Sequence, residues 1–251
     1  AEPALPLIFV GRFDEAEKQV SDLPRIAREL DRLDVPFTLT LAGAGRQERQ
    51  LRGELAPFGA RVQFTGLLPQ GELAHRLYRP GSVLLITSPS ETGPLVAWEA
   101  MARGVVVVTS RFLGLQAEGS LQDGRNCLSF PVGDAAAAAR CIARLRDRTL
   151  LRNLAEEGRQ TVVARYSRAA SIQAWDGALR SALAMHRMDH LPHAPVPVAG
   201  RLDRGLGVGA AEEVRRRLRI AYAHACAGDE WPHTYAMHPP EEIGSRIRQL
   251  D

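Results

Sequence analysis

Short apolar segments alternate with longer amphipathic segments along the first 184 residues of the chain. The short segments predict six strands, at residues 5–10, 37–42, 62–65, 83–86, 105–108 and 127–131. Residues 83–86 and 105–108 are apolar throughout, which is typical of strands covered on both faces of a parallel sheet. The segments between and after the strands predict helices, at residues 22–33, 47–56, 69–78, 94–104, 133–145, 150–164 and 169–184. This alternation predicts an α/β domain with a doubly wound, Rossmann-like parallel sheet at residues 1–184.

Residues 185–251 differ in character from the part before them. Three prolines predict a linker at residues 185–208 (Pro192, Pro195 and Pro197). No predicted strand precedes the glycines that follow, so they indicate flexible spacing rather than a phosphate-binding loop (Gly205, Gly207 and Gly209). Residues 210–227 predict a basic helix within a helical tail at residues 209–251. The arginine-rich run at 215–219 favours a solvated helix face over contact with an anionic membrane or a partner.

The segment from residue 88 to residue 110 predicts a loop, a short helix, a turn and a strand. Pro94 suits the first position of the helix, with Gly93 as its N-cap and Gly104 at its end. Glu91 falls in the loop, whereas Glu99 falls within the helix among apolar residues, so we expect this helix to be mostly buried. A buried carboxylate needs a hydrogen-bond donor from the protein or from a ligand.

The start of the same helix predicts an anion site, because the backbone N–H groups of Leu95 and Val96 are free and carry partial positive charge. An anion site beside two carboxylates indicates a ligand with both phosphate and hydroxyl groups. The alternative is a buried helix whose one polar residue is satisfied inside the protein.

Seven residues separate Glu91 from Glu99, and Ala-Met-Ala and a glycine at 104 follow the second glutamate. Together with Pro89-Ser90 before the first glutamate, this stretch resembles the retaining, GT-B-fold glycosyltransferases of family 4, the group 1 glycosyl transferases. The family has Gly-Phe-Gly after its first glutamate, where this chain has Thr92-Gly93-Pro94. That difference keeps the N–H donors and changes the sugar pocket. The resemblance covers residues 5–184 and implies that the chain is the donor-binding, C-terminal half of a GT-B fold.

The resemblance also implies a set of site residues. Arg12 and Lys18, the only lysine of the chain, would hold the donor's diphosphate. Glu91 would accept hydrogen bonds from the transferred sugar, and Glu99 from the ribose, with only water and the helix N-terminus holding Glu99 in the free protein. The catalytic set is therefore Arg12, Lys18 and Glu91. The donor-binding set is Gly11, Gly43, Gly66, Leu67, Thr92, Gly93, Pro94, Leu95, Val96 and Glu99.

The chemical signals fall where successive predicted strands end, and ligands of doubly wound sheets bind along that edge. Gly43-Ala44-Gly45 is not a nicotinamide dinucleotide fingerprint, because Glu48 occupies the place of the third glycine. The glycines instead indicate close approach of backbone to a nucleotide or another loop. Glu118 is an approximate match to an acidic residue that the family carries in the loop after the fifth strand.

Composition changes this picture little. The chain has 251 residues, a net charge of +3 and a pI near 9.0, which is too weakly basic to indicate nucleic acid binding. It has no segment long and apolar enough to span a membrane, and its first residues are not a signal peptide, so we expect a cytoplasmic protein, with peripheral contact at the inner membrane face left open. Three cysteines and the histidines of the tail show no disulfide or zinc spacing (Cys127, Cys141, Cys226, His224, His233 and His238).

The sequence therefore predicts a glycosyltransferase that moves a sugar from a UDP- or GDP-sugar to an acceptor hydroxyl with retention of configuration. No Asp-x-Asp cluster is present, so we expect neither a metal nor another cofactor. The expected acceptor is a glycan, a lipid-linked sugar or a small molecule in bacterial polysaccharide or glycoconjugate synthesis, bound by an N-terminal acceptor domain that the chain lacks. The alternatives are a noncatalytic nucleotide-sugar-binding or regulatory module and a nucleotide-sugar epimerase, which is disfavoured because the paired-glutamate helix is not its signature.

Overall fold

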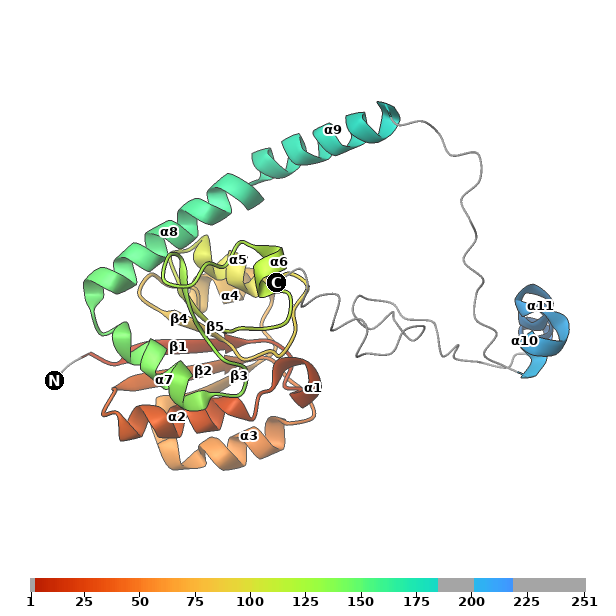
Figure 1. Cartoon of the computed structure of the whole chain (residues 1–251). Helices are drawn as coiled ribbons and strands as arrows, with labels where there is room; N and C mark the ends of the chain where they lie inside the picture. The colour runs from red at the N-terminus through yellow and green to blue at the C-terminus, as the bar shows by residue number, and fades with distance from the viewer. Residues whose placement is uncertain (1–2, 185–200, 219–251) are drawn as a thin grey trace. The chain divides into compact units, whose positions relative to one another are not determined.

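A computed structural model of the chain describes residues 3–184 and 201–218 (Figure 1). The chain divides into two compact units between Ala178 and Leu179, and each is considered by itself. The first unit holds a single sheet with helices on both faces.

The sheet has six strands in the order β3-β2-β1-β4-β5-β6, and every neighbouring pair is parallel. This confirms the predicted doubly wound fold. Each strand agrees with its predicted range to within two residues. The strands are β1 (Leu5–Val10), β2 (Phe37–Ala42), β3 (Val62–Gly66), β4 (Val83–Ile86), β5 (Val106–Ser110) and β6 (Cys127–Phe130).

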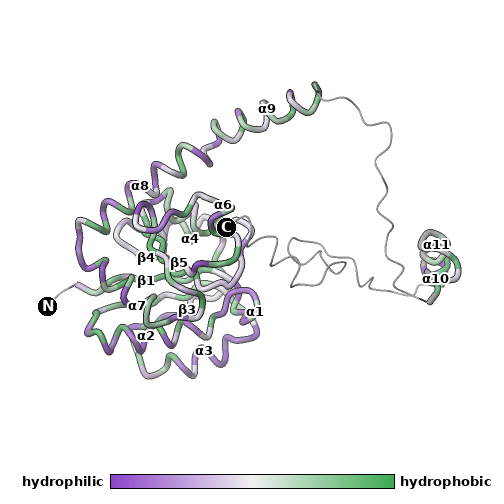
Figure 2. The backbone as a smooth tube through the Cα atoms, viewed as in Figure 1, coloured by the Kyte–Doolittle hydropathy of each residue, from purple (hydrophilic) through white to green (hydrophobic). Residues whose placement is uncertain are grey.

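Helices cover both faces of the sheet because consecutive strand residues point to opposite sides. Leu7 and Phe9 belong to one apolar cluster, together with residues of α2 and α7, whereas Ile8 belongs to a second cluster with residues of α5. Figure 1 shows α2, α3 and α7 on one side of the sheet and α4 and α5 on the other. The strand β4 is hydrophobic throughout, as expected of a central strand, whereas α3 is mostly hydrophilic (Figure 2).

The helices of the first unit follow the strands in the expected order. They are α1 (Glu15–Lys18), α2 (Asp22–Arg32), α3 (Glu48–Leu55), the 3₁₀ helix η1 (Ala56–Arg61), α4 (Gln70–Arg76), α5 (Leu95–Met101), α6 (Leu115–Glu118), α7 (Ala135–Arg144), α8 (Arg148–Tyr166) and α9 (Arg168–Ala184), of which residues 179–184 fall in the second unit. The sequence did not predict α1, where a loop was expected. This single turn forms because the Asp14 side chain accepts a hydrogen bond from the N–H of Glu17 at its start, and it ends at Gln19 with φ of 43°.

The helix α5 differs from its prediction in two respects. It begins at Leu95 with Pro94 as the N-cap, one residue later than expected, and its last residue is Met101. The expectation that it is mostly buried is wrong. Ala97, Ala100 and Met101 are buried, but Leu95 is 65% exposed and Glu99 is partly exposed, because α8 and Gln70 cover the side of α5 away from the sheet only in part.

Besides the end of α9, the described part of the second unit contains α10 (Arg201–Leu206) and α11 (Val208–Leu218), which pack against each other. The prediction of a linker up to residue 208 is therefore wrong for residues 201–206, and Gly207 with φ of 77° forms the turn between the helices. Arg215 is buried, so the run at 215–219 is not a wholly solvated face, although Arg217 is exposed and pairs with Glu213. Gly205 lies in α10 and Gly209 in α11, so the expectation of flexible spacing is wrong at these two positions. The three linker prolines and residues 219–251 lie outside the described residues.

No helix among the described residues is long and apolar enough to cross a membrane. The described part of the chain also contains no group of three histidine, cysteine or acidic side chains arranged to hold a metal ion. His224, Cys226, His233 and His238 lie outside the described ranges.

Candidate functional site

The candidate site lies at the carboxyl edge of the sheet, where the loops after β1, β2, β3 and β4 meet. The strand order changes direction between β1 and β4, which are neighbours although β2 and β3 separate them in the sequence. Loops that leave in opposite directions from such a pair open a crevice at the end of the sheet. The predicted site residues lie at the end of β3, on the segments that follow these strands, including α1, and on α5.

A pocket of about 260 Å³ lies at the ends of β1, β2 and β3. It brings together four predicted site residues that come from three separate loops: Gly11, Arg12, Gly43 and Leu67. The other lining residues are apolar, with Leu73 contributed by α4. Its lining is therefore mainly apolar, with one guanidinium at the rim.

The glycines after β2 allow the loops to approach closely. A Cβ atom on Gly43 would lie 1.9 Å from the carbonyl oxygen of Gly11, and a Cβ on Gly45 would lie 2.3 Å from that of Phe13. Backbone hydrogen bonds join the same loops, including Phe13 N–H to the Ala44 carbonyl at 2.9 Å. These glycines are required by contact between the loops after β1 and β2, which is one of the two uses that the sequence indicated.

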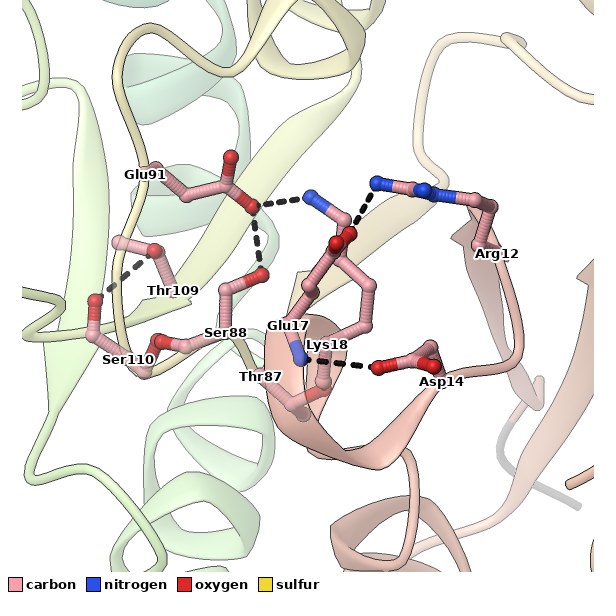
Figure 3. A network of polar contacts seen from close by, with 9 residues as sticks. All are labelled: Arg12, Asp14, Glu17, Lys18, Thr87, Ser88, Glu91, Thr109 and Ser110. Atoms are coloured by element: carbon pink, nitrogen blue, oxygen red, sulfur yellow. Dashed lines mark hydrogen bonds and ion pairs between the residues drawn. The ribbon is translucent and has the colours of Figure 1, made fainter. Parts of the chain in front are cut away.

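Lys18 and Glu91, which are 73 residues apart in the sequence, form an ion pair at this edge (Figure 3). Lys18 Nζ lies 2.5 Å from Glu91 Oε1, and the two side chains are 24% and 13% exposed. Ser88 Oγ donates to the same carboxylate oxygen at 2.5 Å. The lysine and the first glutamate of the signature are therefore partners in the free protein, which the sequence did not predict.

Arg12 forms an ion pair with Glu17, on α1 (Figure 3). The Arg12 side chain is 69% exposed, so water screens this pair more than the pair of Lys18 with Glu91. Both predicted phosphate-binding cations thus contact carboxylates. The sequence did not predict the roles of Glu17 and Ser88. The only signal for them was their position in the sequence, with Glu17 next to Lys18 and Ser88 three residues before Glu91.

Glu99 has two donors within the protein. Gln70 Nε2 lies 2.7 Å from Glu99 Oε1, and the hydroxyl of Tyr78 lies 3.5 Å from Oε2. The expectation that water and the helix terminus alone hold Glu99 in the free protein is therefore wrong, because α4 brings Gln70 over α5. Tyr78 is buried, and its burial, followed by the charge of Glu99, raises the pKa of its hydroxyl well above the ordinary value.

The loop that carries Thr92, Gly93 and Pro94 rests on Trp98. Gly93 has φ of 140°, and a Cβ atom there would lie 3.1 Å from the Trp98 ring. Trp98 stacks on Tyr166 with ring centroids 4.1 Å apart, and Glu118 accepts a hydrogen bond from the Tyr166 hydroxyl at 2.8 Å. Glu118 therefore has a partner on α8, and it helps to hold the tryptophan that supports the signature loop.

A second, larger hollow of about 720 Å³ lies between α2 and the start of α7 and is lined by arginines. Each of these arginines already pairs with a carboxylate: Arg25 with Asp22 at 2.8 Å, Arg28 with Glu54 at 3.8 Å and Arg32 with Glu29 at 3.0 Å. No residue of the predicted site lines it. The pocket at the strand ends is therefore the better candidate.

The comparison with known families agrees with this geometry. Residues 5–148, more than half of the chain, match the family described as glycosyl transferases group 1. The chain belongs to this family. The match confirms the resemblance to the group 1 glycosyl transferases that the two glutamates indicated.

Individual relatives of the chain are longer proteins. It is 33% identical over 147 residues to sulfoquinovosyl transferase SQD2 of Arabidopsis thaliana, a match that covers 58% of this chain and 27% of that protein. It is 36% identical over 94 residues to the lipopolysaccharide core biosynthesis glycosyltransferase LpsE of Rhizobium meliloti, which covers 37% of this chain and 27% of that protein. The matches thus span about a quarter of each curated relative.

Among solved structures, the chain is similar to the pneumococcal O-GlcNAc transferase GtfA in complex with UDP and GlcNAc. The TM-score is 0.61, the identity is 20%, and the match covers 73% of this chain and 37% of that one. At this identity the likeness supports the fold, which is the Rossmann-like fold of a GT-B glycosyltransferase.

Proposed function

We propose that this chain binds a nucleotide-diphosphate sugar at the carboxyl edge of its sheet and is the donor-binding part of a retaining glycosyltransferase. One observation carries the proposal. The apolar pocket, the two cations Arg12 and Lys18, and the carboxylate of Glu91 all belong to loops that leave the β1–β4 switch point or its neighbours. An apolar pocket, cations and a carboxylate are the complements of a base, a diphosphate and a sugar, respectively.

In this arrangement the base occupies the pocket between Gly11, Gly43 and Leu67, the last of which is 79% exposed and free to lie against a ring. The diphosphate lies between Arg12 and Lys18. The sugar hydroxyls reach Glu91, and the ribose hydroxyls reach Glu99. GtfA, solved with UDP and GlcNAc, is a precedent for such a ligand on this fold.

The proposed chemistry places its main demand on the diphosphate. When the sugar leaves, negative charge grows on the phosphate oxygen while an oxocarbenium-like centre forms at the anomeric carbon. Fixed cations that face this oxygen stabilise the transition state more than the ground state. Arg12 and Lys18 are suited to this role without a metal ion, provided that Lys18 exchanges Glu91 for phosphate.

The rest of the reaction requires parts beyond the described site. We propose that a second Rossmann-like domain binds the acceptor, which is a glycan, a lipid-linked sugar or a small molecule. An acceptor carried by lipid would require a cytoplasmic protein to work at the inner membrane face. LpsE, a relative named for lipopolysaccharide core biosynthesis, supports a role in bacterial glycoconjugate synthesis.

Isothermal titration calorimetry of the full chain with UDP, GDP, ADP and their sugars tests the proposal. We expect one base to be preferred and its affinity to be the same with and without a chelator. Arg12→Ala and Lys18→Ala should each weaken diphosphate binding roughly tenfold to a hundredfold, as expected for a charge-assisted hydrogen bond of about 1.5–3 kcal/mol. Arg32→Ala is the matched control, because Arg32 ends α2 and pairs with Glu29.

Two outcomes would contradict this reasoning. If no nucleotide binds the wild-type chain, the donor site is wrong. If chelator abolishes binding, the metal-free arrangement of Arg12 and Lys18 is wrong. Transfer itself is tested on the complete enzyme with its acceptor domain, since a noncatalytic binding module would pass the titration and fail to transfer sugar.

A further inference from the structure

Thr87 and Ser88, the two residues that follow β4, hold the two partners of the ion pair separately. Thr87 Oγ1 donates to the backbone carbonyl of Lys18 at 2.6 Å, whereas Ser88 Oγ donates to Glu91 Oε1 at 2.5 Å. Both residues are buried, with 0% and 1% of their surface exposed. A buried hydroxyl is costly unless it is hydrogen-bonded, so each has a defined orientation.

The backbone of Ser88 is held in turn by the neighbouring strand. Ser110, the last residue of β5, is buried and its Oγ donates to the Ser88 carbonyl at 2.5 Å. The strands β4 and β5 are paired up to Ile86, two residues before Ser88, and Thr109, one residue before Ser110. Ser88 is therefore fixed by its side chain, its carbonyl and the sheet beneath it.

Lys18 and Ser88 share one carboxylate oxygen but differ in freedom to leave it. Lysine carries its charge on a flexible four-carbon stem, so an arriving phosphate can draw the ammonium away from Glu91. The buried Ser88 hydroxyl has no comparable freedom. Among the described residues no donor contacts Glu91 Oε2, which points away from both Lys18 and Ser88 (Figure 3).

We propose that Ser88 is a positioning residue for the donor sugar. Its hydroxyl, anchored through Ser110, keeps the Glu91 carboxylate in place after a phosphate group has displaced Lys18, so that Oε2 can accept a hydrogen bond from a sugar hydroxyl. This inference rests on the proposed function in one respect, namely that Glu91 contacts the sugar. The contact of Ser88 with Glu91 does not depend on it.

A double-mutant cycle on the ligand-free chain tests the contact. Ser88→Ala should lower the melting temperature by roughly 3–10 °C, the shift expected from losing a hydrogen bond to a charged group in a domain of this size. In a Glu91→Ala background the Ser88 hydroxyl has lost its acceptor, so the same change should cause no fall or a rise. Ser90→Ala is the matched control in the same loop and should have a small effect, equal in both backgrounds.

Ligand binding tests the positioning role. UDP is compared with UDP-glucose, and GDP with GDP-mannose, and the pair that the wild-type chain binds is used. Ser88→Ala should weaken the nucleotide-sugar about tenfold while changing the nucleoside diphosphate by less than about twofold, because only the sugar uses Glu91. Ser110→Ala should act in the same direction with a smaller effect, which covers the case in which Ser88→Ala does not fold.

The outcomes separate the two ideas. An additive cycle, or equal losses for diphosphate and nucleotide-sugar, would overturn the role of Ser88 while leaving donor binding intact. If the wild-type chain binds none of the four ligands, the proposed function fails and the sugar role of Ser88 fails with it, although the cycle still measures the Ser88–Glu91 contact.

Discussion

Replacing Glu91 with glutamine should change the affinities for a nucleoside diphosphate and for its sugar in opposite directions. Glutamine has the shape of glutamate and an oxygen that can still accept from Ser88, but it lacks the charge that holds Lys18 at 2.5 Å. In the wild-type chain a phosphate must compete with Glu91 for Lys18. In Glu91→Gln this competitor is gone, so the diphosphate should bind more tightly.

The size of the gain follows from the environment of the ion pair. Exposed pairs contribute about 0–1 kcal/mol, and hydrogen bonds to charged groups about 1.5–3 kcal/mol. The side chains of Lys18 and Glu91 are 24% and 13% exposed, which places the pair between these limits. A value of about 1 kcal/mol predicts roughly fivefold tighter binding of UDP or GDP. The nucleotide-sugar gains the same fivefold from the released Lys18 but loses roughly tenfold with its charged acceptor, so it should bind about twofold more weakly to the variant than to the wild type.

Calorimetry of the wild type and the variant with both ligands measures these ratios. Glu17→Gln is the matched control, since it releases Arg12 from a pair in which the arginine is 69% exposed, and it should change UDP affinity by less than about twofold. The gain at Glu91 should also shrink at high salt, because screening weakens the competing pair. A fall in diphosphate affinity in Glu91→Gln would refute the reasoning, because Lys18 would then not be the group for which phosphate and carboxylate compete.

Three further predictions concern stability and the signature helix. Gly93→Ala should lower the free energy of unfolding by about 1–3 kcal/mol in urea denaturation, because Gly93 has φ of 140° and faces the Trp98 ring. The control Gly53→Ala, which has open space around it on the helix α3, should raise the free energy of unfolding by about 0.4–1 kcal/mol. Equal effects of the two substitutions would contradict this reasoning. Burial raises the pKa of Asp22 above its ordinary 3.8 despite the nearby Arg25, so the folded state binds this proton more tightly than the unfolded state. The stability of the wild type relative to Asp22→Asn should therefore fall as the pH rises from about 3.8 through the pKa of Asp22 in the folded state. Urea titrations of both proteins over about pH 3.5–6.5 measure this difference. If the difference stays constant or changes in the other direction, Asp22 is not the cause. Glu99→Gln should change the free energy of unfolding by less than about 1 kcal/mol, because Gln70 can still donate to the new side chain and the Tyr78 contact is long at 3.5 Å. The same substitution should weaken the binding of UDP and of its sugar equally, roughly tenfold. Unchanged affinities would mean that Glu99 serves only Gln70 and Tyr78.

The strands could be predicted from the sequence because their environment is uniform. Val83–Ile86 is covered on both faces, so every residue is apolar and the segment is recognisable without knowing its neighbours. The arrangement of the site residues at one edge then follows from the parallel order of the strands. Loops that are distant in sequence, such as those of Gly11, Gly43 and Leu67, must meet there, and they line a common pocket.

The one-turn helices could not be predicted in this way. Glu15–Lys18 has too few residues to show a period, and its formation depends on one hydrogen bond from Glu17 N–H to the Asp14 side chain. That single turn places Lys18 beside β4, where Thr87 binds its carbonyl. A small local feature therefore determines where the only lysine of the chain lies.

The polar partners of the site were the least predictable part, and α5 shows why. A run of apolar residues around Glu99 indicates a buried helix, but periodicity does not reveal how wide a face the rest of the protein covers. Here Ala97, Ala100 and Met101 are buried, while Gln70 on α4 and Tyr78 after α4 contact Glu99. Because these donors are uncharged and Gln70 is exposed, a ribose hydroxyl could replace them without leaving a buried charge unpaired. Glu91 differs, since its partner in the free protein is a cation, and this difference is the reason that the two glutamates of one signature should respond to mutation with different ligand preferences.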